Sequence, residues 1–124
     1  MARTNEALAT HAQIARSLIP RMVGLLGKSS LEEGAGLVLM ACRSIHTVGM
    51  RFAIDAVFVD RAWAVVAIRK SLPPWRMTPL ILRAHAVIEL PAGTVERTHL
   101  VIGDRVLLEP VGGKISLTIR DVPR

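Results

Sequence analysis

The sequence predicts a small, mainly β domain: a β-sandwich or barrel with one α-helix near the N-terminus. Short apolar runs of strand length recur along the chain, turns containing Gly or Pro separate them, and one segment has clear helical spacing. With 124 residues, 51% of them hydrophobic, the chain is long enough for one domain with its own core, which we place over residues 1–124.

The predicted helix covers Leu18–Leu26, where apolar residues recur on one helical face. Ser17 is a suitable N-cap, Pro20 is tolerated in the first turn, and Gly27 can end the helix. The upstream segment Ala7–Ala15 is compatible with a helix or a short edge strand, and we favour the strand.

Downstream of the helix the pattern changes to strands. Alternation within Phe52–Val59 places Asp55 and Phe58 on opposite faces, and Asp60 begins a turn into a hairpin. Two prolines make Leu72–Arg76 a loop, because proline removes ladder donors. The other predicted extended segments are Leu37–Met40, Ser44–Val48, Trp63–Arg69, Ala84–Leu90, Arg105–Glu109 and Lys114–Arg120.

The composition narrows the expected location and partners. A single cysteine excludes an intramolecular disulfide, and no secretory signal or run of roughly 20 apolar residues stands out, so we expect a cytoplasmic protein that does not bind membranes. The net charge is +6 and thirteen of the sixteen basic residues are arginines, but they are spread singly along a chain with no Tyr. This distribution argues against nucleic-acid binding, whereas a small anion needs only two or three arginines.

The stretch from Cys42 to Asp60 concentrates chemically useful groups. Cys42 or Ser44 could be a nucleophile, His46 its base, and Asp55 or Glu89 the residue that orients the base. In a straight strand, however, residues four apart are about 13 Å apart, so Cys42 and His46 need a turn or partners from other strands. The alternative is structural: a small buried thiol, and a histidine that bonds a neighbouring carbonyl.

No metal or cofactor is predicted. The four histidines, His11, His46, His85 and His99, lack the short paired spacing of a zinc motif.

Ten residues in fixed order, followed by the run Glu89-Leu90-Pro91-Ala92-Gly93, resemble domain-of-unknown-function family 192 over about residues 10–110. The ten are Cys42, Ser44, His46, Thr47, Gly49, Met50, Phe52, Ile54, Asp55 and Phe58. The resemblance implies a small, mainly β domain with a helix and no established activity, so it assigns no catalytic residue. Positions that match the polar signature of the family are Cys42, Ser44, His46, Thr47, Met50, Arg51, Asp55, Trp75 and Glu89.

The leading functional hypothesis is a domain that binds a small anionic or sugar-like ligand, or a protein partner, without catalysis. The predicted ligand-binding residues are His46, Thr47, Met50, Arg51, Trp75, Arg76 and Glu89. Trp75 could instead plug one end of the core. The rival hypothesis is a hydrolase or transferase that uses Cys42 or Ser44 with His46. A third, a structural partner-interaction module, predicts an exposed apolar patch and no polar pocket.

Overall fold

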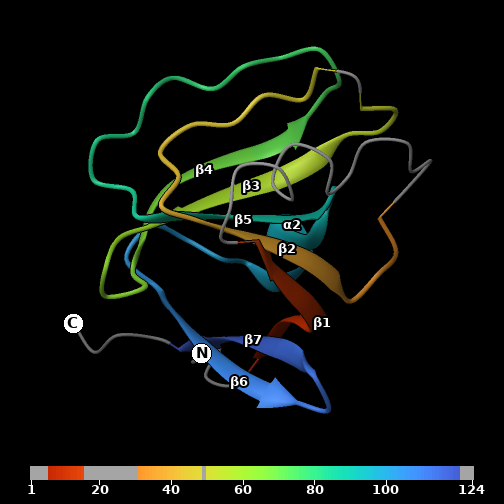
Figure 1. Ribbon diagram of the computed structural model, residues 1–124, viewed down its shortest axis with the longest axis vertical. Coiled ribbons are helices and arrows are strands. Elements are labelled where there is room, and N and C mark those ends of the chain that lie inside the picture. Colours follow the sequence, from red (N-terminus) through yellow and green to blue (C-terminus); the bar gives the residue numbers. More distant parts are fainter. Residues whose placement is uncertain (1–5, 16–30, 49, 121–124) are drawn as a thin grey trace.

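The computed structural model describes residues 6–15, 31–48 and 50–120 (Figure 1). The predicted helix Leu18–Leu26 lies outside the described residues. The described elements are β1 (Glu6–Ala15), β2 (Ala35–Met40), β3 (Ile54–Val59), β4 (Val65–Leu72), β5 (Ala86–Pro91), α2 (Thr94–Thr98), β6 (Arg105–Val111) and β7 (Lys114–Arg120). The strand expected over Ala7–Ala15 is confirmed within β1, and β7 has the predicted bounds.

All seven strands belong to one mixed sheet with the order β4-β3-β5-β2-β1-β7-β6. The β1–β2 pair is parallel and the other neighbouring pairs are antiparallel. The two edges approach at one end, where the Val65 N–H donates to the Asp104 carbonyl at 2.8 Å. Among the described residues, one isolated bridge rather than a ladder joins these edges, so the sheet is not closed. The mainly β prediction is confirmed; the sandwich or barrel is not.

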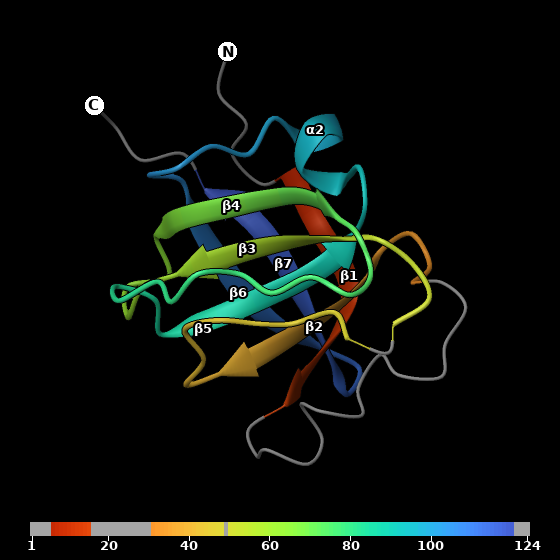
Figure 2. The same cartoon turned by 90° about the horizontal axis from the view of Figure 1, so that it is seen from above.

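The sheet is strongly curved and encloses an inner core. In the view of Figure 2, the part with β6 and β7 lies behind the part with β4, β3 and β5. Leu8, Val38, Val57, Ile88, Leu90, Leu117 and Ile119 are among the buried residues of the inner core. This cluster includes side chains from all seven strands, and apolar burial of this kind is the main stabilising contribution to the fold.

The opposite side of β2, β3 and β5, called here the outer face, carries a second apolar cluster. It contains Leu37, Leu39, Ile54, Phe58 and Val87, together with Ile45, Met50 and Ala84 from two covering segments. The described parts of these segments, residues 41–48 and 50–53 in the first and 73–85 in the second, cross the outer face (Figure 2). One face of β3 packs in the inner core and the other in the outer-face cluster, so all six of its residues are buried. Val57 and Phe58 belong to different clusters, as the alternation predicts.

The short helix α2 is not apparent in the sequence. It follows Gly93, whose φ of 96° lies in the left-handed region that suits glycine, and ends where His99 has a φ of 57°. The Val95 N–H in its first turn donates to Asp55 Oδ2 at 2.8 Å. A contact from β3 therefore fixes the start of α2. Five residues are too few to show helical periodicity, which is why the sequence did not indicate this helix.

Candidate functional site

The two segments on the outer face are fastened together through Thr47. Its hydroxyl donates to the Pro73 carbonyl at 2.6 Å and accepts from the Arg76 N–H at 2.9 Å. Its backbone N–H donates to the Arg76 carbonyl at 2.8 Å. Thr47, one of the predicted ligand-binding residues, is fully buried, and these bonds hold the start of the 73–85 segment in place.

A second set of contacts continues this connection. The Thr78 N–H donates to the Ile45 carbonyl at 2.9 Å, and the Ile45 N–H donates to Thr78 Oγ1 at 3.0 Å. His46 and Met77 form an isolated antiparallel bridge between these positions. The stretch predicted as a strand over Ser44–Val48 is therefore extended, but only this bridge pairs it within the described residues.

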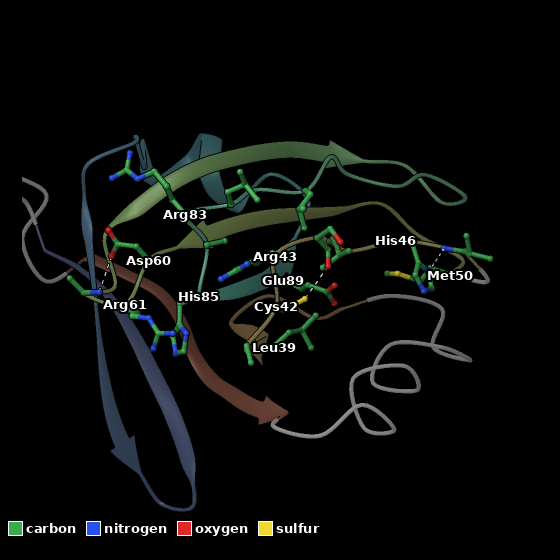
Figure 3. Close-up of a pocket in the computed structure, with 18 residues that line it drawn as sticks. Leu39, Cys42, Arg43, His46, Met50, Asp60, Arg61, Arg83, His85 and Glu89 are labelled. Atoms are coloured by element: carbon green, nitrogen blue, oxygen red, sulfur yellow. Dashed lines mark hydrogen bonds between the residues drawn. The ribbon is translucent and has the colours of Figure 1, made fainter.

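A cavity of about 980 Å³ lies between the outer face and these segments (Figure 3). Its apolar wall includes Leu39, Ile45, Val48, Met50, Leu80 and Leu82, and its polar lining includes Cys42, Arg43, Ser44, His46, Asp60, Arg61, Arg83, His85 and Glu89. In Figure 3, His46 and Met50 lie at one end, Asp60, Arg61, Arg83 and His85 at the other, and Cys42, Arg43 and Glu89 between them. Apolar walls with a few polar groups are typical of small-molecule sites.

Glu89 is the buried acidic residue of this cavity. It lies on the central strand β5, paired with Leu37 of β2 and Ala56 of β3, and it is 5% exposed. No described residue forms a hydrogen bond or ion pair with its carboxyl group. Burial raises the pKa of this carboxyl from 4.5 to about 7, because the apolar surroundings disfavour the charged form.

Cys42 and His46 both line the cavity, but they do not form a nucleophile–base pair. The Cys42 thiol donates to the Ser44 carbonyl at 3.0 Å, and His46 Nδ1 accepts from the Val48 N–H at 3.3 Å. Figure 3 draws the thiol and the imidazole apart, consistent with an extended segment. Within the described residues, no hydrogen bond activates either the thiol or the Ser44 hydroxyl through His46.

Asp55, the other candidate orienting acid, lies on the inner face. Its Oδ1 accepts from the Ser71 N–H and its Oδ2 from the Val95 N–H, each at 2.8 Å. Asp55 is fully buried and does not line the cavity. Both oxygens have backbone donors, so its observed role is to join β3 to the end of β4 and to the start of α2.

Three other predicted ligand-binding residues lie away from the cavity. Arg51, Trp75 and Arg76 are exposed and none of them lines it. Trp75 is 65% exposed with a φ of 63°, so it does not plug the core. Of the predicted ligand-binding set, the structure brings together His46, Met50 and Glu89.

The cavity also has cationic residues that the sequence reasoning missed: Arg43, Arg61 and Arg83. Val59 at the end of β3 and Met40 at the end of β2 both pair with Ala86 at the start of β5. Arg43 and Arg61 follow those ends and Arg83 precedes that start, so all three meet at one end of the sheet. Strand order was the missing signal, since without it the three arginines look scattered.

Within the described ranges, no group of three His, Cys, Asp or Glu residues could hold a metal ion. Over the same ranges, no helix is long and apolar enough to cross a membrane.

Fold and cavity together define a small, mainly β domain with one curved sheet and a lined cavity on its outer face. The chain belongs to the family DUF192, described as Uncharacterized ACR, whose sequence model matches residues 1–108. The family resemblance seen in the sequence is thus confirmed. No curated protein matches the sequence significantly.

Two solved structures share the fold. A protein of unknown function from Novosphingobium aromaticivorans DSM 12444 is 20% identical, with a TM-score of 0.69 over 76% of this chain and 71% of that one. A candidate transcription regulator from Sinorhizobium meliloti 1021 is 22% identical, with a TM-score of 0.66 over 76% of this chain and 78% of that one. At these identities the likeness establishes the fold alone.

Proposed function

We propose that this domain binds a small molecule with an anionic group in the outer-face cavity, without chemical conversion. The observation that carries the proposal is the cavity itself, in which an apolar wall is combined with three arginines. None of the three guanidinium groups forms an ion pair with a described residue, so each can offer its donors to a carboxylate or phosphate.

The carboxylate at the end of the cavity with Arg61 and Arg83 is Asp60, which is already engaged by the backbone. Asp60 Oδ1 accepts from the Ala62 N–H at 2.9 Å and from the Ala64 N–H at 3.0 Å, which stabilises the turn after β3. His85 adds a further nitrogen-bearing side chain at the same end. This end of the cavity is therefore better suited to an anion than to a cation.

Catalysis is less well supported than binding. A hydrolase or transferase needs a nucleophile within hydrogen-bonding reach of its base, whereas the Cys42 thiol is bonded to the Ser44 carbonyl. A pure partner-interaction module predicts no polar pocket, which does not fit the lining described above. We therefore expect Cys42 to react slowly with iodoacetamide at neutral pH, in line with a thiol that is not activated.

A thermal-shift screen against small carboxylates, phosphates, sugar phosphates and neutral sugars tests the proposal. We expect one or more anions to raise the melting temperature, with a stabilisation of about 2.7 kcal/mol when free ligand is a hundredfold above its dissociation constant. The double variant Arg43→Gln/Arg83→Gln should lose this shift. Arg105→Gln, an exposed arginine outside the cavity, is the matched control and should keep it. A panel without any hit, or an equal shift in the double variant, would contradict the proposal.

A further inference from the structure

Glu89 is an unusual residue for its position on the sheet. Its neighbours in the register are Leu37 and Ala56, and Val87 precedes it on the same face of β5. An apolar side chain would continue this surface, whereas a buried carboxyl group without a partner destabilises the folded state. A buried carboxyl group that lowers stability at the wall of a cavity is a reason to look for a function there.

The surroundings restrict what the partner of Glu89 can be. Glu89 is 5% exposed as a residue and lines the cavity, and no described protein group donates to its carboxyl group. The cavity is therefore the direction from which a hydrogen-bond donor can reach it. In apolar surroundings an ammonium group suits a carboxylate better than a neutral hydroxyl, because it supplies both donors and the opposite charge.

We propose that Glu89 binds an ammonium group of the ligand, so that the ligand is a small zwitterion with its amine at Glu89 and its acid group at the arginines. This inference rests on the proposed function, which supplies the anionic end. Burial of Glu89 supports it, because the raised pKa of about 7 is the response expected of a carboxyl that lacks an opposite charge. Glu89 lies in the middle of the cavity and Arg61 and Arg83 lie at one end (Figure 3), so apolar lining residues such as Leu39 would contact the carbon body of a ligand that spans this distance.

Matched ligands separate this inference from the proposed function. The probes are ω-amino carboxylates of two to six carbons, the unsubstituted carboxylates of the same lengths, and the ω-hydroxy carboxylates, each titrated by calorimetry into the full chain. We expect the best amino acid of the series to bind at least about tenfold more tightly than its unsubstituted and hydroxy counterparts.

Variants then test the role of the carboxylate. Glu89→Gln keeps the shape of the side chain and removes its charge. This variant should bind the best amino carboxylate about 30-fold or more weakly than the wild type does. The same variant should change the affinity for the unsubstituted carboxylate by less than about threefold. Glu96→Gln, an exposed glutamate on α2, is the matched control and should leave both affinities unchanged.

The outcomes discriminate between the two proposals. If the unsubstituted or hydroxy carboxylates bind as tightly as the amino carboxylates, or if Glu89→Gln weakens all of them equally, the zwitterion inference is wrong and anion binding stands. If none of the probes binds, the zwitterion inference is wrong again, and only a carboxylate-free anion such as a phosphate from the thermal-shift screen could still support the proposed function.

Discussion

Asp55 and Glu89 are two buried carboxyl groups on neighbouring strands, and their surroundings assign them different roles. Asp55 lies on the inner face with a backbone N–H at each oxygen, so it is a structural residue. Glu89 lies on the outer face beside the cavity, without a donor from the described residues. The same functional group thus joins secondary-structure elements in the first case and faces a candidate binding site in the second.

Asp55→Asn should destabilise the protein by about 2 kcal/mol, measured as a shift of the midpoint of urea unfolding. The substitution replaces one acceptor oxygen by an NH₂ group, which must then face the N–H of either Ser71 or Val95. Asp60→Asn is the matched control. The Asp60 side chain accepts both of its hydrogen bonds from described residues through Oδ1 alone, so the carbonyl oxygen of asparagine can replace it. The loss should be below about 1 kcal/mol. Equal losses at the two positions would contradict this interpretation.

The sequence predicted on which face of the sheet a strand residue lies, but not which residues would be its hydrogen-bond partners. Alternation within Phe52–Val59 places Asp55 opposite Phe58, as the structure confirms. That Asp55 would meet Val95, forty residues away, depends on a tertiary contact that no local pattern contains. The same holds for Thr47, whose hydroxyl bonds the segment that begins at Pro73.

At the level of elements, regular strands were predictable and irregular ends were not. Lys114–Arg120 is confirmed with its bounds, because alternation and flanking glycines act locally. β4, by contrast, continues to Leu72, past Ser71, which has a φ of 50° and donates its N–H to Asp55. A side chain from another strand stabilises this irregular end, so the sequence of β4 alone does not indicate it.

Thr47→Val should loosen the connection between the covering segments and lower the free energy of unfolding by about 2 kcal/mol. The change keeps the shape but leaves the Pro73 carbonyl and the Arg76 N–H without their partner hydroxyl. Native-state hydrogen exchange should show faster exchange at Arg76.

Thr98→Val is the matched control for this experiment. The Thr98 hydroxyl donates to the Thr94 carbonyl within α2, so its loss should reduce stability without a specific increase of exchange at Arg76. For each variant, the increase in the exchange rate at Arg76 is compared with the loss of global stability. If this ratio is the same for both variants, Thr47 does not hold the segment as described.

At the level of the whole molecule, the curved sheet has the inner core on one face and the candidate binding site on the other. The inner core is enclosed between the two parts of the sheet, whereas irregular segments cover the outer face and leave room for a cavity. The arginines at its lining come from three separate places in the sequence, Arg43, Arg61 and Arg83. The order of the strands brings them together, which is why composition indicated an anion site but could not locate it.

The pH dependence of global stability should report the burial of Glu89. With a pKa of about 7 in the folded state and 4.5 as the ordinary value, the folded state binds more protons between these pH values. Stability from this group is therefore greatest below about pH 4.5 and falls as the pH rises through 7, by about 3 kcal/mol in total. Glu89→Gln has no such group, so its unfolding free energy minus that of the wild type should increase by about this amount between pH 4.5 and pH 8.5.

Urea unfolding at a series of pH values measures this difference directly, because the contributions of groups that both proteins share largely cancel in it. Glu109→Gln removes a carboxyl at an exposed position of β6 and should reproduce the pH profile of the wild type. A difference between Glu89→Gln and the wild type that stays constant with pH would mean that the carboxyl is stabilised in its charged form. That would contradict its description as a buried group without a partner, and with it the reason to seek an ammonium-bearing ligand.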